Sequence, residues 1–212
     1  MRRREQARVL GILVVLVLLA AIGVGGWYFF IYMKSPQYAL NQFLDAAKAG
    51  DTERVDRYAD ATGPILGFIG MASMAMGGGG MDPITLIFPG YKSAEFGQTQ
   101  SYEVKSLSVE GETARAQVTL KVAAPSGEVT MNPTYVLRKV EGQWKVAVEP
   151  TLAGSFNEFV PNAVRQQMIR RIRQLAGNPM VQSMVAPQIN SIRSEIEKYP
   201  QLRDFLKSAG LL

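Results

Sequence analysis

The sequence predicts an α+β fold with an N-terminal transmembrane helix, an antiparallel sheet with packed helices, and a C-terminal tail of short helices. Residues 9–33 carry no charge and exceed the roughly 20 apolar residues that a helix needs to cross a bilayer. Residues 101–149 contain runs in which apolar and polar side chains alternate, as in half-buried strands. After Pro150, prolines separate amphipathic segments, which predicts short helices.

The charges that flank residues 9–33 predict the orientation of the anchor. Four arginines precede the apolar run and Lys34 follows it, so we expect residues 1–8 in the cytoplasm and the domain outside it. A cleaved signal peptide is the alternative, but its apolar core of roughly 7–15 residues would end before Trp27. We therefore expect a single-pass protein of the cell membrane whose residues 9–33 contact the lipid bilayer.

The composition excludes several kinds of chemistry. The 212 residues include no cysteine and no histidine, which removes disulfides, thiolate catalysis and the commonest ligands of zinc. The tetraglycine at 77–80 lacks the Lys-Ser/Thr ending of a phosphate-binding loop. The net charge of +5 is not spread as a basic stripe with interleaved aromatics. We therefore expect no cofactor, no metal ion and no nucleic-acid partner.

Two helices are predicted to open the domain. Ser35 is a suitable N-cap, Pro36 suits the first helical position, and Gly50 can end the helix. Asp51 is then placed to cap a second, shorter helix. The buried face of the first helix should be formed by apolar residues at helical spacing: Leu40, Phe43, Leu44 and Ala47.

The strands are predicted from alternation and from turn residues. Glu110-Gly111 and Glu141-Gly142 indicate hairpin turns. A change of phase predicts a bulge near residues 105–106. Pro133 interrupts its strand, which should therefore bend or lie at an edge of the sheet there. One strand has all its apolar side chains on one face: Ala114, Ala116, Val118, Leu120 and Val122.

Fold-determining residues recur through these helices and strands: Pro36, Phe43, Leu44, Ala46, Gly50, Asp51, Tyr58, Ala114, Val118, Tyr135, Leu137, Gly142, Trp144 and Val146. Over residues 35–150 this pattern resembles the nuclear-transport-factor-2-like fold, in particular its bacterial branch of secreted or anchored, lumazine-binding-like domains. The resemblance implies a cone-like curved antiparallel sheet with packed helices around an internal pocket. Some proteins of this fold are isomerases, cyclases or dehydratases, and others bind ligands or partners without known catalysis.

The resemblance also implies which side chains would line the pocket: Tyr102, Val118, Leu120, Tyr135, Leu137 and Trp144. The acidic and tyrosine side chains nearest to such a pocket by position are Asp45, Tyr102, Glu128 and Tyr135. Each of these also has an ordinary structural explanation, so we assign no catalytic residue.

Residues 64–91 interrupt this domain with an apolar insertion rich in glycine and methionine. Its helical part from Pro64 would rise only about 20 Å, short of a bilayer core of roughly 30 Å. We expect a lid over the open side of the cone, whereas a membrane-dipping segment and a second membrane pass are the alternatives. The lid candidates are Phe68, Met71, Met74, Met76, Gly77, Gly78, Gly79 and Gly80.

Residues 151–212 are predicted to form a helical tail, divided by four prolines: Pro161, Pro179, Pro187 and Pro200. Four arginines of one helix form a candidate surface for a membrane or a protein partner: Arg165, Arg170, Arg171 and Arg173. The alternative is that these helices only pack onto the domain or onto each other.

The function expected from the sequence is that of a membrane-anchored extracytoplasmic domain that binds a small apolar ligand or a protein partner without catalysis. A pocket acid/base enzyme of the same fold is the first alternative, and an envelope scaffold acting through the C-terminal helices is the second. A homodimer through the sheet or the C-terminal helices is also compatible with the sequence.

Overall fold

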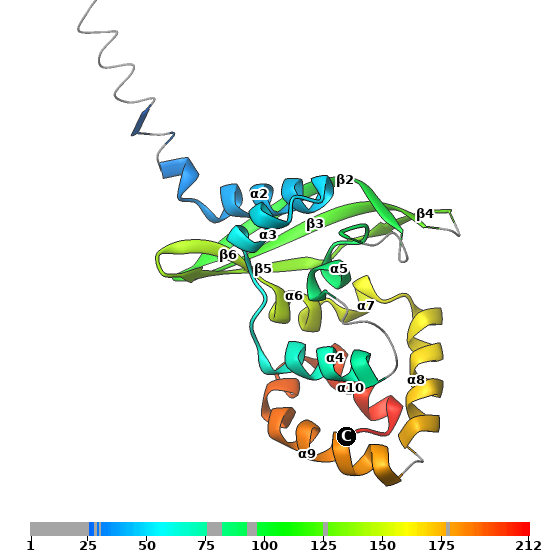
Figure 1. Cartoon of the computed structure of the whole chain (residues 1–212). Coiled ribbons are helices and arrows are strands. Elements are labelled where there is room, and N and C mark those ends of the chain that lie inside the picture. Colours follow the sequence, from blue (N-terminus) through cyan, green and yellow to red (C-terminus); the bar gives the residue numbers. More distant parts are fainter. Residues whose placement is uncertain are drawn as a thin grey trace, which may run out of the picture.

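The computed structural model describes residues 26, 27, 29, 31–75, 82–92, 97–124, 127–176 and 179–212. The predicted cytoplasmic tail, most of the predicted anchor and residues 76–80 of the predicted lid lie outside this part of the chain. In the view of Figure 1, the helices labelled α2 and α3 lie above the sheet and the other labelled helices lie below it.

The first two helices begin and end where the sequence predicts. Helix α2 (Pro36–Ala49) begins at Ser35, whose hydroxyl accepts the backbone N–H of Tyr38 at 3.1 Å. It ends at Gly50, which has a φ of 70°, a left-handed conformation that glycine adopts without a steric penalty. Helix α3 (Thr52–Tyr58) is capped by the carboxylate of Asp51.

The sheet is mixed, with the strand order β1-β6-β5-β3-β2 and with β4 paired to β3. Its strands are β1 (Ala59–Asp60), β2 (Gln98–Glu110), β3 (Thr113–Ala124), β4 (Gly127–Met131), β5 (Thr134–Val140) and β6 (Gln143–Ala147). The antiparallel part is confirmed. The parallel pairing of β1 with β6 was not predicted, because a two-residue strand shows no alternation.

The predicted irregularities of the sheet are confirmed. The register of β2 against β3 shifts between Val104 and Ser106, next to the predicted bulge. Pro133 separates β4 from β5, and both strands pair with β3. The β5–β6 hairpin turns through Glu141 and Gly142, which have φ values of 51° and 81°, as a two-residue hairpin turn requires.

The first core lies between one face of the sheet and α2. Alternate residues of β3 point into this core, and the ring of Phe43 on α2 lies 6.2 Å from that of Tyr135 on β5. Helix α5 (Pro83–Ile87) and the residues after it complete the core, with Ile87 and Tyr91 fully buried. On the other face of β3, Arg115 and Lys121 are exposed.

The first residues of β5, which do not pair with β6, are covered by the chain that follows β6. Helix α6 (Val148–Gly154) starts directly after β6, and helix α7 (Phe156–Phe159) follows it. The hydroxyl of Thr151 accepts the backbone N–H of Val136 at 2.9 Å, and the hydroxyl of Ser155 accepts that of Thr134 at 2.9 Å. These side chains replace the strand neighbour that β5 lacks at its start.

A second core joins the remaining helices, which are α4 (Pro64–Ala75), α8 (Asn162–Ala176), α9 (Pro179–Ile196) and α10 (Pro200–Ala209). Its buried residues are Ile65, Ala153, Phe156, Ile169, Ile192, Ile196, Leu202, Phe205, Leu206 and Ala209. Helix α4 was predicted as part of an insertion in the first domain, and it packs against α9 of the predicted tail. Figure 1 shows these helices as one layer below α6 and α7.

The predicted break at Pro187 is wrong, because α9 continues through this proline. A proline inside a helix lacks one N–H and costs about 3 kcal/mol. The burial of Ile189 and Ile192 in the next turns offsets this cost, so tertiary packing overrides the local preference.

The transmembrane helix in the predicted fold class is also wrong for this structure. Among the described residues, none of the helices combines the length and the apolar character needed to cross a membrane. The most apolar of them, α4, has 12 residues, whereas a crossing needs about 20. Residues 9–25 of the predicted anchor lie outside the described part.

Candidate functional site

The predicted pocket-lining residues lie in the first core. Val118, Leu120, Tyr135 and Leu137 are completely buried, and Tyr102 and Trp144 are half-buried at the margin. The hydroxyl of Tyr135 donates to the backbone carbonyl of Ile87 at 2.5 Å. Burial raises the pKa of this phenol far above its ordinary value, so the hydroxyl is a permanent donor. That these side chains line a ligand pocket stays a prediction.

Two of the candidate acid/base residues lie in direct contact. The hydroxyl of Tyr102 on β2 donates to the carboxylate of Asp45 on α2 at 2.5 Å. Burial raises the pKa of Tyr102, and the hydrogen bond and negative charge of Asp45 raise it further. The pair lies at the rim of the sheet, because Asp45 is exposed. Tyr102 is therefore a poor base at neutral pH.

A cation lies next to this pair. The guanidinium of Arg54 on α3 donates to the side-chain oxygen of Gln42 on α2, with 3.0 Å from Nε. The positive charge of Arg54 lowers the pKa of Tyr102, but this effect is smaller than the effects of burial and of Asp45 that raise it. The rim of α2, α3 and β2 therefore carries one carboxylate, one phenol and one guanidinium.

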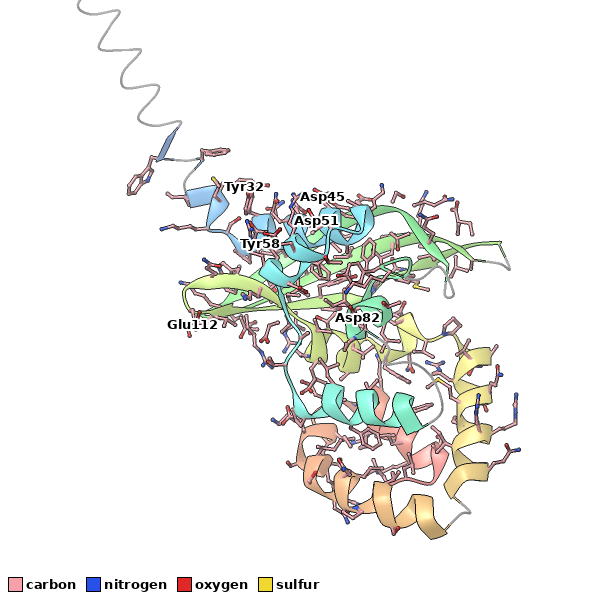
Figure 2. All side chains as sticks on the ribbon, viewed as in Figure 1. Tyr32, Asp45, Asp51, Tyr58, Asp82 and Glu112 are labelled. Carbon is pink, nitrogen blue, oxygen red and sulfur yellow. The ribbon has the colours of Figure 1, made fainter. Side chains whose placement is uncertain are left out.

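The other acid/base candidates do not join this group. Glu128 is exposed on β4, and Tyr135 is used inside the core. Figure 2 shows Asp45 on α2 and Asp82 at the start of α5, well apart from each other. Titratable residues are thus distributed over the fold, and no group of acidic side chains in the described ranges is placed to hold a metal ion.

A second polar group surrounds α5 and was not found from the sequence. Asp82 caps α5 through the N–H of Ile84 and also accepts from the ammonium of Lys92 at 2.7 Å. That ammonium lies 4.9 Å from the ring centroid of Tyr91. The hydroxyl of Tyr91 is buried and has no hydrogen-bond partner within the described part of the chain. Asp82, Tyr91 and Lys92 are not part of a periodic pattern or a known motif, so the sequence alone did not indicate that they lie together.

Glu149 is a buried carboxylate that the sequence did not single out. Its Oε2 accepts the backbone N–H groups of Ile65 and Leu66, at 2.8 and 3.2 Å, in the first turn of α4. Burial raises the pKa of Glu149, whereas these two hydrogen bonds lower it. Gly63 lies directly against this carboxylate, since a Cβ there would be 2.0 Å from Oε2. The group fixes the start of α4 to the first turn of α6, directly after β6.

The structure describes the side chain of only one lid candidate, Phe68. Phe68 lies on α4 and packs against the second core. Nothing is described of the side chains of Met71 and Met74, and residues 76–80 lie outside the described ranges. A lid over the sheet therefore stays a prediction.

The four arginines of α8 fall into two pairs. Arg165 donates to the side chain of Asn157, and Arg173 donates twice to the carbonyl of Ser208, at 3.0 and 2.6 Å. Arg170 and Arg171 are exposed. The sequence predicted four equivalent arginines, and the structure leaves two of them directed to solvent.

Comparison with known proteins gives little about function. No protein-family model matches the chain, and no curated protein matches it. Among solved structures, the chain is similar to an NTF2-like transpeptidase of Campylobacter jejuni, with a TM-score of 0.33 and 15% identity. The similarity covers 53% of this chain and 98% of the other. That neighbour is named for the fold that the sequence resembles, but a similarity this low carries no argument about activity, and the lumazine-binding-like branch is not shown.

Proposed function

We propose that this protein is a non-enzymatic binding domain and that its partner is a protein rather than a small apolar ligand. The observation that carries the proposal is the packing of the sheet face expected to line a pocket. Its central side chains are completely buried in a core shared with α2 and α5.

Large side chains occupy this face. Phe43 and Tyr135 are both fully buried, and the rings of Phe43 and Phe159 each lie 6.2 Å from that of Tyr135. Pockets for drug-sized ligands have volumes of about 300–1,000 Å³, whereas protein interiors are close-packed. A face filled in this way favours recognition at the outer surface.

The placement of the acidic residues favours a non-catalytic role. An acid or base for catalysis must lie within hydrogen-bond reach of the substrate, often in an apolar site that shifts its pKa. Of the described carboxylates, Glu149 alone is buried, and it caps α4 instead of facing the sheet. The pair of Asp45 and Tyr102 lies at the exposed rim.

Native mass spectrometry of the purified full chain tests this proposal. We expect the mass of the bare chain under gentle ionisation, because buried side chains occupy the sheet face that would line a pocket. A stoichiometric small-molecule adduct would contradict the proposal. The Ala116→Leu variant is the matched control, since added volume on the sheet face should displace a genuine pocket ligand.

A second candidate function is acid/base catalysis at the rim, favoured by the 2.5 Å contact between Tyr102 and Asp45. If this candidate function is correct, the protein should turn over a carbonyl substrate, and both the Asp45→Asn and the Tyr102→Phe variants should be inactive. Screening the full chain with simple enolisable ketones would support it only if both variants are inactive while Lys105→Gln, on the same strand, stays active.

A further inference from the structure

We propose that the outer face of α8, built around Arg170 and Arg171, is a docking surface for an acidic protein segment. The inference rests on the proposed function, because it gives the protein partner a place to bind and a chemistry. Figure 1 shows α8 at the outer edge of the helical layer, and Figure 2 shows nitrogen-bearing side chains projecting from its outer side.

Helix α8 is held from its inner side, which fixes the direction of these two arginines. Ile169 is buried in the second core, and Met168 and Ile172 pack against that core. Arg165 and Arg173 are bonded to α7 and to the last turn of α10. The side chains opposite this anchored face therefore point to solvent.

The charge on this outer face has no local counterion. Residues three or four positions apart are neighbours on a helix, and around Arg170 and Arg171 these positions hold no acidic residue. Their exposed neighbours at these positions are Arg173, which donates to the carbonyl of Ser208, and three glutamines: Gln166, Gln167 and Gln174.

Elsewhere on the described surface, several cations have an acidic partner close by. Arg57 pairs with Glu53, Lys105 with Glu103 and Lys198 with Glu195. Arg203 pairs with Glu197 and Asp204 on the neighbouring helical surface. Arg170 and Arg171 have no acidic side chain at neighbouring positions of their helix, so their guanidinium groups are available for a partner.

An acidic protein segment fits this face better than a membrane does. A helix that lies on a bilayer inserts an apolar face among the lipids, but Met168, Ile169 and Ile172 of α8 pack in the second core. Single-stranded nucleic acid would require aromatic side chains for base stacking, and α8 contains none.

The geometry also favours carboxylates as the recognised groups. A guanidinium binds a carboxylate through two parallel hydrogen bonds, which lysine cannot do. Arg170 and Arg171 are consecutive, so they leave the helix about 100° apart and can hold carboxylates on two sides of one segment. The glutamine side chains offer both donors and acceptors to its backbone.

Fluorescence anisotropy of the full chain with a fluorescein-labelled peptide of alternating glutamate and alanine tests the proposal at low salt. Arg170→Glu with Arg171→Glu should weaken binding roughly tenfold or more. Arg115→Glu with Lys121→Glu, on the exposed face of β3, changes the net charge equally and should alter binding by less than about twofold. Arg170→Lys with Arg171→Lys should weaken binding to an intermediate degree, because it keeps the charge but removes the paired hydrogen bonds of the guanidinium groups.

Equal weakening in both reversal variants would overturn the proposal, because net charge alone would then explain binding. Binding to phosphatidylglycerol vesicles that depends on Arg170 and Arg171, without binding to the peptide, would overturn it in favour of a lipid surface. Circular dichroism confirms that each variant is folded. If the peptide fails while native mass spectrometry shows the bare chain, the docking surface is wrong and the proposed function stands.

Discussion

The carboxylate of Glu149 accepts the backbone N–H of Ile65 at 2.8 Å, across 84 positions of sequence. This bond joins the first turn of α6, directly after β6, to the start of α4, and α4 in turn packs against α9. An N-terminal turn leaves its first N–H groups without partners inside the helix. Glu149 supplies that partner and so couples the two cores.

Gly63 should be intolerant of any side chain. It has a φ of 146°, and a Cβ would lie 2.0 Å from Oε2 of Glu149. Gly63→Ala should therefore lower the free energy of unfolding by about 1–3 kcal/mol. Gly67→Ala, within the α4 helix that Gly63 precedes, is the matched control, because nothing lies within 4 Å of the added Cβ. It should raise that free energy by about 0.4–1 kcal/mol. Urea denaturation of both variants measures the difference, and equal effects would reject the described contact.

Glu149 should make stability depend on pH in an unusual direction. Burial raises its pKa in the folded chain above the ordinary 4.5, so the folded state binds a proton more tightly than the unfolded state. Its contribution is then complete below pH 4.5 and is lost as pH rises through the raised pKa. Negative Glu195 on α9 adds to the shift, whereas positive Arg138 on β5 opposes it.

The Glu149→Gln variant isolates this effect, because glutamine can still accept a hydrogen bond and does not titrate. We expect the free energy of unfolding of the native chain, relative to this variant, to fall as the pH rises above 4.5. A difference that stays constant or increases as the pH rises would show that the carboxylate is not desolvated.

Thr151 should be needed as a hydroxyl rather than for its shape. Its Oγ1 accepts the N–H of Val136, which is buried in the part of β5 that does not pair with β6. Thr151→Val keeps the volume and leaves that N–H unpaired, which should cost about 1–3 kcal/mol. Thr130→Val, at an exposed position of β4, should change stability by less than about 0.5 kcal/mol. Thermal unfolding of both variants would contradict this account if Thr151→Val were as stable as the native chain.

Tyr102 should titrate above an ordinary tyrosine, because burial and then Asp45 raise its pKa above 10.0. Asp45→Asn removes the negative charge and should lower the pKa of Tyr102. NMR of ring-labelled tyrosine, with Tyr102→Phe to assign the resonance, measures both values. An unchanged titration in Asp45→Asn would show that the 2.5 Å contact is not formed in solution.

Local signals predicted most of the sheet and its first helices. Ser35, Gly50 and Asp51 act within one turn of their own helix, and Pro133 removes a donor at its own position. Such effects depend on neighbours in sequence, so the sequence alone contains them. The contact of Asp45 with Tyr102 joins residues 57 positions apart, and only the packing of α2 on the sheet brings them together.

What the sequence missed depends on distant contacts. The parallel pairing of Ala59 with Val146 and the capping of α4 by Glu149 have no local signature. Pro187 gave a false signal, because the burial of the following isoleucines outweighs its local cost. All four residues of this set on α8 are arginines, so the residue type alone cannot distinguish Arg173, which donates to Ser208, from Arg170 on the outer face.

The central claim is that the inner face of the sheet is a filled core, and the stability of Ala116→Leu tests it most directly. Ala116 is completely buried and lies opposite Tyr135 in the β3–β5 register. In a filled core the added volume should lower the free energy of unfolding by about 1–3 kcal/mol. Ala163→Leu, exposed on α8, should leave it within about 0.5 kcal/mol. An Ala116→Leu variant as stable as the native chain, or more stable, would show that this face encloses a pocket and would contradict the account.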